Sequence, residues 1–276
     1  MAFKRLNGIV LHHQTLGPRE GPALVFANSL GSDLRIWDRV APAFADRFRV
    51  ILYDLRGHGL SDAPNGPYTL DDHLRDLLGL LDHLSVPSAS VVGLSVGGMI
   101  AQRMAVRAPG RIDALVLCCT AAKIGTSESW GERISAVERA GVGSVVPGVL
   151  ERWFTPAYRQ DRADDCAGWA NMIARTPVQG YAGTCASIRD ADLTADARAI
   201  GIPTLCVAGD QDGSTPADLV RRTCDLIPDA RFALIAGAGH IPCIEQPEAL
   251  TRLIADHLGR GPHLGEDPHL GEARHV

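Results

Sequence analysis

The sequence contains no long hydrophobic run, no excess of basic residues and no C-x-x-C motif. No stretch reaches the roughly 18 consecutive apolar residues of a transmembrane helix, and the first residues lack the apolar core of a signal peptide. The 276 residues include 27 Lys and Arg against 32 Asp and Glu, so nucleic acid is not an expected partner. We therefore expect a cytoplasmic protein that binds neither nucleic acid nor membranes.

The seven cysteines are an odd number, and no two are spaced as C-x-x-C. This pattern disfavours a disulfide framework, which needs even numbers, and a cysteine-based zinc motif. A chain of this length buries a sizeable core without such cross-links. We expect reduced, mostly buried thiols and no metal.

Short apolar runs alternate with amphipathic segments in the first 120 residues and again near the C-terminus. This alternation predicts a mostly parallel central sheet flanked by helices on both faces. The predicted strands are Ala23–Ala27, Val50–Asp54, Ser90–Leu94, Ala114–Cys118, Thr204–Gly209 and Arg231–Ile235. The predicted helices are Ile36–Phe44, Leu70–Leu84, Gly97–Ala108, Ala217–Ile227 and Pro247–Leu258.

Residues 121–195 interrupt this alternation. They hold three of the four tryptophans and no clear strand, and prolines divide them into short helical pieces. We predict a helical cap here, inserted into one α/β core formed by residues 1–120 and 196–259. Residues 260–276 contain PHLGE twice and are rich in Gly, Pro, His and charge, which predicts a disordered tail.

The segment Gly93–Gly97 reads GLSVG and matches the pattern G-x-S-x-G. It lies between a predicted strand and a predicted helix, where a tight turn needs glycine on either side of the serine. Such a turn lifts a serine hydroxyl clear of the sheet and places it at a helix N-terminus. We predict Ser95 as a nucleophile.

A serine hydroxyl needs a base, and His240 in the loop AGAGHIP after the last predicted strand is the favoured candidate. The alternative base is His58, which also follows a strand but precedes the serine; we expect it to shape the wall of the site. The remaining histidines of the first half are expected at the surface: His12, His13, His73 and His83.

The base in turn needs a carboxylate that fixes its tautomer. Asp210 and Asp212 both follow the predicted strand Thr204–Gly209, and either side chain could reach. We favour Asp212, because Asp210 directly continues the strand and is better placed to support the loop. The oxyanion of an attacked carbonyl needs two donors, and the backbone N–H groups of Leu30 and Val96 are the candidates.

Together these residues resemble the α/β-hydrolase superfamily over nearly the whole chain. Asp54–Asp62 reads DLRGHGLSD, which is similar to the superfamily's D-x-R-G-x-G-x-S loop, and the order serine, aspartate, histidine is the order of its triad. The resemblance implies an α/β-hydrolase fold and a serine hydrolase that needs no cofactor.

A narrower likeness connects the chain to the 3-oxoadipate enol-lactonases. It rests on the oxyanion loop NSLG at 28–31 and on four segments: GLSVGGMIAQ at 93–102, TAAKIG at 120–125, RWFTP at 152–156 and GYAGTCASIRDADL at 180–193. Val96 departs from it, because methionine is common there. This likeness implies opening of 3-oxoadipate enol-lactone to 3-oxoadipate in the β-ketoadipate pathway of aromatic catabolism.

Such a substrate carries a free carboxylate, so the pocket should offer a cation. The candidates are Arg133, Arg152, Lys123 and Arg35, and each also fits a solvated surface position. Trp130 lies three residues before Arg133, and Trp153 directly follows Arg152; both tryptophans could form the apolar underside of the cap.

Two other classes of function fit the same pattern. One is a different enzyme on this scaffold: an esterase, another lactonase or a cofactor-free haloperoxidase-like enzyme. The other is a non-catalytic binding protein, which the complete set of serine, aspartate and histidine disfavours. A dehalogenase is disfavoured because its nucleophile would be aspartate.

Overall fold

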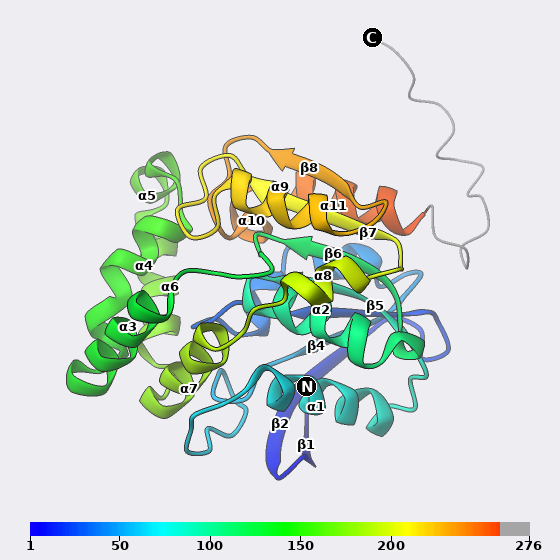
Figure 1. The fold of residues 1–276 in the computed structure, drawn as a ribbon, viewed down its shortest axis with the longest axis horizontal. Helices are drawn as coiled ribbons and strands as arrows, with labels where there is room; N and C mark the ends of the chain where they lie inside the picture. Colours follow the sequence, from blue (N-terminus) through cyan, green and yellow to red (C-terminus); the bar gives the residue numbers. More distant parts are fainter. Residues whose placement is uncertain (260–276) are drawn as a thin grey trace.

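The computed structural model describes residues 1–259, so the predicted tail at 260–276 lies outside the described residues. Its centre is an eight-stranded sheet in the order β1-β2-β4-β3-β5-β6-β7-β8 (Figure 1). β2 pairs antiparallel with β1 and with β4, and all other pairs are parallel. The strands are β1 (Ala2–Leu6), β2 (Ile9–Leu16), β3 (Ala23–Ala27), β4 (Arg49–Tyr53), β5 (Ala89–Leu94), β6 (Ile112–Cys118), β7 (Thr204–Gly209) and β8 (Arg231–Ile235).

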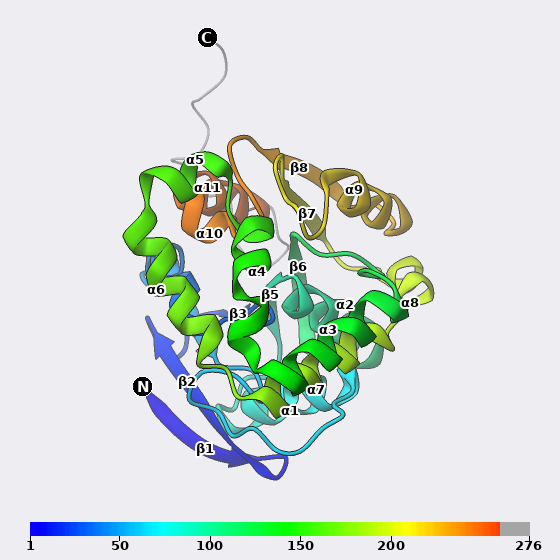
Figure 2. The ribbon, with the colours of Figure 1, turned by 90° about the vertical axis from the view of Figure 1, so that its left-hand side faces the viewer.

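Helices cover both faces of this sheet. Figure 2 shows α9 and α11 on opposite sides of β7 and β8. The α-helices are α1 (Leu70–His83), α2 (Val96–Arg107), α3 (Ser127–Ala140), α4 (Val146–Trp153), α5 (Pro156–Asp161), α6 (Ala163–Ala174), α7 (Val178–Arg189), α8 (Thr194–Ala199), α9 (Ala217–Leu226), α10 (Pro242–Glu245) and α11 (Pro247–Leu258). The prediction of an α/β fold with a mostly parallel sheet is confirmed.

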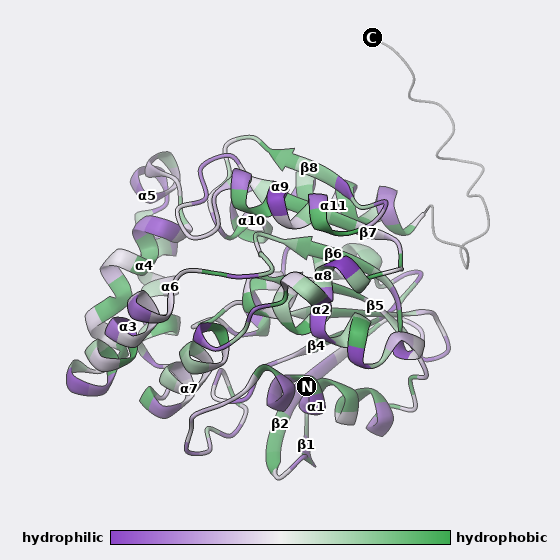
Figure 3. Ribbon diagram, viewed as in Figure 1, coloured by the Kyte–Doolittle hydropathy of each residue, from purple (hydrophilic) through white to green (hydrophobic). Residues whose placement is uncertain are grey.

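The core follows from the apolar runs of the strands. Every residue of β3 and β7 is buried, as expected for central strands covered on both faces. Hydropathy colouring shows the neighbouring strand β6 mostly green, while purple gathers on outer helices such as α3 and α5 (Figure 3). All seven cysteines are free and buried, as predicted. Within residues 1–259, no helix combines the length and the apolarity that crossing a membrane requires.

Two parts of the fold differ from the prediction. The N-terminal hairpin of β1 and β2 was not predicted, because β1 lies at the sheet edge, mostly exposed, and has no apolar run. The predicted helix Ile36–Phe44 is instead two short 3-10 turns, η1 (Leu34–Trp37) and η2 (Ala41–Phe44). Pro42 explains the break, because it cannot donate a helical hydrogen bond.

Three of the four histidines expected at the surface are buried, so that prediction was wrong. His12 and His13 lie on β2, and the Nδ1 of His12 is 2.7 Å from a carboxylate oxygen of Asp54. His73 lies on the face of α1 that α7 covers, and burial together with the nearby Arg56 lowers its pKa to about 3. Sequence spacing could not show these faces as covered, because distant segments cover them. His83 is exposed, as predicted.

Helices α3 to α7 lie between β6 and β7 in the chain and gather on the left of Figure 1, in front of the sheet in Figure 2. α7 approaches the core through glycines. A Cβ atom on Gly180 would lie only 2.2 Å from the carbonyl oxygen of Gly57, and one on Gly183 only 2.8 Å from the ring of Tyr68. Only glycine permits this backbone approach.

Candidate active site

Ser95 occupies a sharp turn between β5 and α2. Its φ of 55° and ψ of −117° lie outside the usual regions for a residue with a side chain, a strain typical of functional positions. A Cβ on Gly93 would lie 2.4 Å from the Gly97 carbonyl oxygen, and one on Gly97 would lie 2.3 Å from that of Ala27. These clashes explain why glycine flanks Ser95 on both sides.

Neighbouring backbone groups hold this turn in place. The N–H of Ser95 donates to the Cys118 carbonyl at 3.0 Å, and the hydroxyl of Thr120 donates to the Ser95 carbonyl at 2.6 Å. Gly98 leaves room for Thr120, because a Cβ there would lie 2.5 Å from the threonine methyl group. Cys118 at the end of β6 and Thr120 just after it thus hold Ser95 in its strained conformation.

His240 and Asp212 form a buried pair on the loops after β8 and β7. The Nδ1 of His240 is 2.9 Å from Oδ2 and 3.1 Å from Oδ1 of Asp212. Oδ1 also accepts the N–H groups of Ser214 and Thr215, and Oδ2 accepts the Thr215 hydroxyl at 2.7 Å. Burial by itself raises the pKa of Asp212, but His240 and the Thr215 hydrogen bonds lower it below its ordinary value. The carboxylate is therefore held ionised against the imidazole.

Asp210 and His58, the alternatives for the carboxylate and the base, make other contacts. Asp210 is exposed, and its carboxylate accepts the N–H of Ala238, which supports the loop as expected. His58 is buried with its Nδ1 3.0 Å from the Arg56 carbonyl, and it does not line the cavity at Ser95. The expectation that His58 shapes the wall of the site was wrong, because its loop turns inward beneath α7.

A cavity of about 160 Å³ brings Ser95 and His240 together. Four of the five substrate-binding candidates that the sequence offers within residues 121–195 line it: Trp130, Arg133, Arg152 and Trp153. Nine further residues line the cavity and were not predicted as site residues: Ser29, Ile124, Gly125, Ser129, Val149, Tyr181, Ile188, Gly213 and Ser214. Five of them lie in the segments that carry the family likeness, at 28–31, 120–125 and 180–193.

Two of the proposed cations lie outside this cavity. The side chain of Lys123 is 56% exposed, and its ammonium group is 3.2 Å from the carboxylate of Asp192. Arg35 forms a 2.6 Å ion pair with Asp33 on another part of the surface. The expectation that Lys123 binds the substrate was therefore wrong, because its side chain points to solvent.

The two arginines of the cavity differ from Lys123 and Arg35, because no carboxylate in the described part of the chain pairs with them. Within residues 1–259, neither Arg133 nor Arg152 forms a salt bridge, and the Arg133 guanidinium lies 5.1 Å from the centre of the Trp130 ring. Burial and the positive charge of Arg133 lower the pKa of Arg152. Burial raises the pKa of Tyr181 to about 12, so its hydroxyl remains neutral beside Arg133. The cavity thus carries uncompensated positive charge.

The candidate oxyanion donors lie on either side of the Ser95 turn. Val96 is the first residue of α2, so its N–H has no acceptor within the helix. Leu30 lines the cavity, and the N–H of Gly97 donates to the Asn28 carbonyl at 3.1 Å, which holds the Leu30 loop against the turn. Asn28 is itself fixed, because Trp37 Nε1 donates to its side chain at 2.9 Å.

The end of α4 is hydrogen-bonded to both loops that carry the pair. The N–H of His240 donates to the Trp153 carbonyl at 2.8 Å, and the N–H of Gly213 donates to the Arg152 carbonyl at 3.3 Å. The half-buried carboxylate of Glu245 accepts the N–H groups of Gly239 at 2.6 Å and of Thr155 at 2.9 Å. The cavity wall and the histidine loop are therefore one connected unit.

Comparison with known proteins agrees with this geometry. Residues 22–140 match the α/β hydrolase fold family. The chain is 35% identical to 3-oxoadipate enol-lactonase 2 of Acinetobacter baylyi, over 89% of this chain and 92% of that one. The structure matches an enol-lactonase from Burkholderia xenovorans with a TM-score of 0.91 and 36% identity, over 94% and 100% of the two chains.

A hydrolase from Pseudomonas aeruginosa is similarly close, with a TM-score of 0.90 and 38% identity over 94% of this chain and 98% of that one. The likeness to the enol-lactonases inferred from the sequence is thus confirmed over nearly the full length. The chain belongs to the α/β-hydrolase family, as a carboxylic ester hydrolase related to the 3-oxoadipate enol-lactonases.

Proposed function

We propose that this protein opens 3-oxoadipate enol-lactone to 3-oxoadipate, with Ser95, His240 and Asp212 as its catalytic triad. The observation that carries the proposal is the cavity itself, in which Ser95 and His240 lie with two arginines that pair with no carboxylate of residues 1–259. A neutral ester would gain nothing from this charge, whereas a lactone with a free carboxylate would be bound and oriented by it. Relatives at about 35% identity support the same substrate.

The reaction follows from the geometry in two halves. His240 takes the proton of Ser95 while the serine oxygen attacks the lactone carbonyl, and the N–H groups of Leu30 and Val96 stabilise the oxyanion. The ring C–O bond then breaks, and the leaving enolate takes up the proton held by His240 and becomes a ketone, which leaves His240 neutral again. Water activated by His240 attacks the acyl-serine, which releases the second carboxylate and restores the Ser95 hydroxyl.

We further propose that residues 121–195 act as a cap over this centre. Trp130 and Trp153 from this segment line the cavity together with Arg133 and Arg152. Apolar rings beside guanidinium groups exclude water and strengthen the attraction between the arginines and a carboxylate. The cap then selects the substrate, while the loops of the core carry the chemistry.

The proposal is tested with a panel of substrates. Freshly generated 3-oxoadipate enol-lactone is followed by the loss of its ultraviolet absorbance, beside uncharged lactones and p-nitrophenyl esters. We expect the highest kcat/KM for the carboxylated enol-lactone, and loss of activity on labelling of Ser95 by a fluorophosphonate. Higher kcat/KM for uncharged esters would assign a general esterase, and absence of labelling of the folded protein would assign a binding protein.

The arginines give a separate prediction. Arg133→Met and Arg152→Met should each raise KM for the carboxylated enol-lactone by about 10- to 100-fold, because a hydrogen bond to a charged group contributes about 1.5–3 kcal/mol. KM for a neutral p-nitrophenyl ester should change little. Lys123→Met is the matched control, since it removes a charge outside the cavity. An unchanged KM for the enol-lactone in both arginine variants would contradict the carboxylate-binding role.

A further inference from the structure

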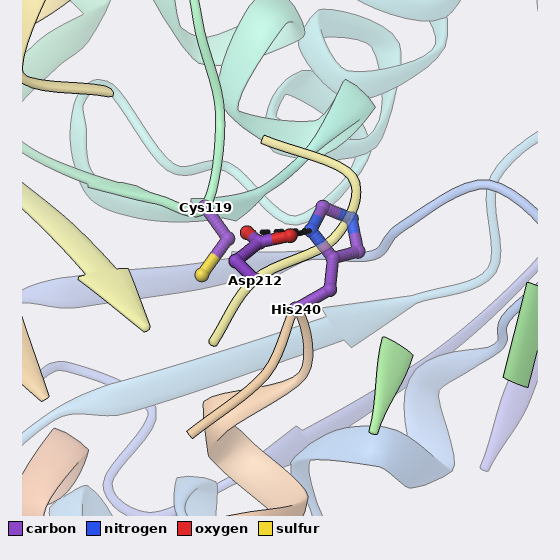
Figure 4. Close-up of side chains that lie close together, drawn as sticks. All are labelled: Cys119, Asp212 and His240. Atoms are coloured by element: carbon purple, nitrogen blue, oxygen red, sulfur yellow. Dashed lines mark hydrogen bonds and ion pairs between the residues drawn. The ribbon is translucent and has the colours of Figure 1, made fainter. Parts of the chain in front are cut away.

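A third reactive side chain lies beside the His240–Asp212 pair. Cys119 directly follows β6, is fully buried, and has a φ of 45°, which side-chain-bearing residues adopt only when the surroundings impose it. Figure 4 shows its sulfur close to the carboxylate of Asp212. One donor atom from each of Cys119, Asp212 and His240 lies within 4.8 Å of the other two.

These three donors are of the kinds that zinc and cadmium bind. Thiolate sulfur, imidazole nitrogen and carboxylate oxygen are the usual protein ligands of Zn²⁺, at about 2.0–2.3 Å in tetrahedral geometry. Such bond lengths set two donors about 3.5 Å apart. His240 Nδ1 and the nearest Asp212 oxygen are already 2.9 Å apart, so the main change required is a shift of the sulfur inward.

The surroundings also favour a defined site. The three ligands follow the adjacent parallel strands β6, β7 and β8, so their loops are held at one edge of the sheet. Thr215 donates to the Asp212 carboxylate and would continue to orient it as an outer partner. Among residues 1–259, this is the sole group of three such donors at this spacing.

We propose that Cys119, Asp212 and His240 form an inhibitory binding site for a thiophilic divalent cation, Zn²⁺ or Cd²⁺. The binding part stands on the geometry alone, whereas the inhibition rests on the proposed function of His240 as the base. Burial raises the pKa of the Cys119 thiol well above its usual range, so the free protein holds a neutral thiol. On binding, the metal takes the thiolate and the thiol proton passes to solvent.

Inhibition follows from the tautomer that the metal imposes. A metal ion on Nδ1 of His240 displaces the proton that this nitrogen shares with Asp212, and the neutral imidazole then carries its proton on Nε2. An Nε2 that already holds a proton cannot accept the one from Ser95. The metal also binds the Asp212 carboxylate, which can then no longer accept a hydrogen bond from the imidazole. His240 thus loses its ability to accept a proton, and Asp212 loses its role in fixing the tautomer.

The test is a titration of the purified full-length protein with CdCl₂. Hydrolysis of a p-nitrophenyl ester gives the inhibition, and the ultraviolet charge-transfer absorption of a cadmium thiolate reports binding independently of activity. The variants are Cys119→Ala and Cys119→Ser, and the control is Cys166→Ala, which removes another buried thiol that lies far along the chain in α6. A chelator should restore activity in each protein that is inhibited.

We expect one cadmium thiolate per chain in the wild type and in Cys166→Ala, with inhibition of both. Both Cys119 variants should keep esterase activity, lose the absorption band and need at least about tenfold more Cd²⁺ for half inhibition, since even outer partners of a metal contribute 10- to 100-fold. Equal inhibition of wild type and Cys119 variants would overturn the proposal. A thiolate band on a protein that hydrolyses no substrate would instead overturn the proposed function and leave the metal site standing.

Discussion

Asp212→Asn is expected to lower kcat for the preferred substrate by about 10⁴-fold, the size of the effect when a triad carboxylate is replaced by an amide. The hydrogen bonds of this site explain why. Oδ1 of Asp212 accepts two backbone N–H groups, so the asparagine oxygen would take that place and its NH₂ group would face His240. The imidazole would then have to accept on Nδ1 and carry its proton on Nε2, where it cannot act as a base.

Asp210→Asn is the matched control for this variant. Its carboxylate accepts one N–H from Ala238 and lies on the exposed side of the same loop, and an asparagine oxygen could keep that bond. We expect kcat to change by less than about tenfold, since the triad is untouched and a neutral acceptor still supports the loop. Steady-state kinetics of both variants decide between the aspartates, and a larger loss in Asp210→Asn would reverse our assignment.

Gly180→Ala is expected to destabilise the protein by about 3 kcal/mol, at the upper end of the usual cost of overpacking. The new methyl group would lie 2.2 Å from the carbonyl oxygen of Gly57, and neither backbone can move without shifting α7 or the loop that follows β4. Urea unfolding measures the free energy of unfolding directly.

Gly168→Ala is the control, and we expect it to raise the free energy of unfolding rather than lower it. Gly168 lies inside α6, and a Cβ there would meet nothing within 4 Å. Alanine is favoured over glycine in a helix by about 1 kcal/mol, so this variant should be more stable than the wild type. A Gly180 variant as stable as the Gly168 variant would show that α7 does not pack closely on the core.

The parts of the site that are local in sequence could be predicted from it. The Ser95 turn needs only a strand, two glycines and a helix start, and all are visible within ten residues. The choice between Asp210 and Asp212 could be argued but not decided, since both follow one strand. The structure shows which of them faces His240: an oxygen of Asp212 lies 2.9 Å from Nδ1 of His240, whereas Asp210 accepts the N–H of Ala238.

What could not be predicted depends on segments distant in the chain. Arg133 and Lys123 lie ten residues apart and look alike in the sequence, yet one lines the cavity and the other pairs with Asp192 at the surface. His73 lies among charged residues in the sequence and is buried because a distant segment, α7, covers it. Local pattern shows which chemistry a residue can offer, but not what covers it.

The hydrogen bonds from the end of α4 to the histidine and aspartate loops limit how new specificity can arise in this protein. Helices α3 and α6 can be exchanged for those of another hydrolase without removing an acceptor from either loop. Residues 152–155 cannot be exchanged in this way. The carbonyl groups of Arg152 and Trp153 accept from Gly213 and His240, and the N–H of Thr155 donates to Glu245. A transplanted helical segment that begins or ends within residues 152–155 would change the lining of the cavity and also remove hydrogen bonds that hold the His240 loop. We therefore expect productive junctions for exchanging the helices of residues 121–195 to lie outside this stretch.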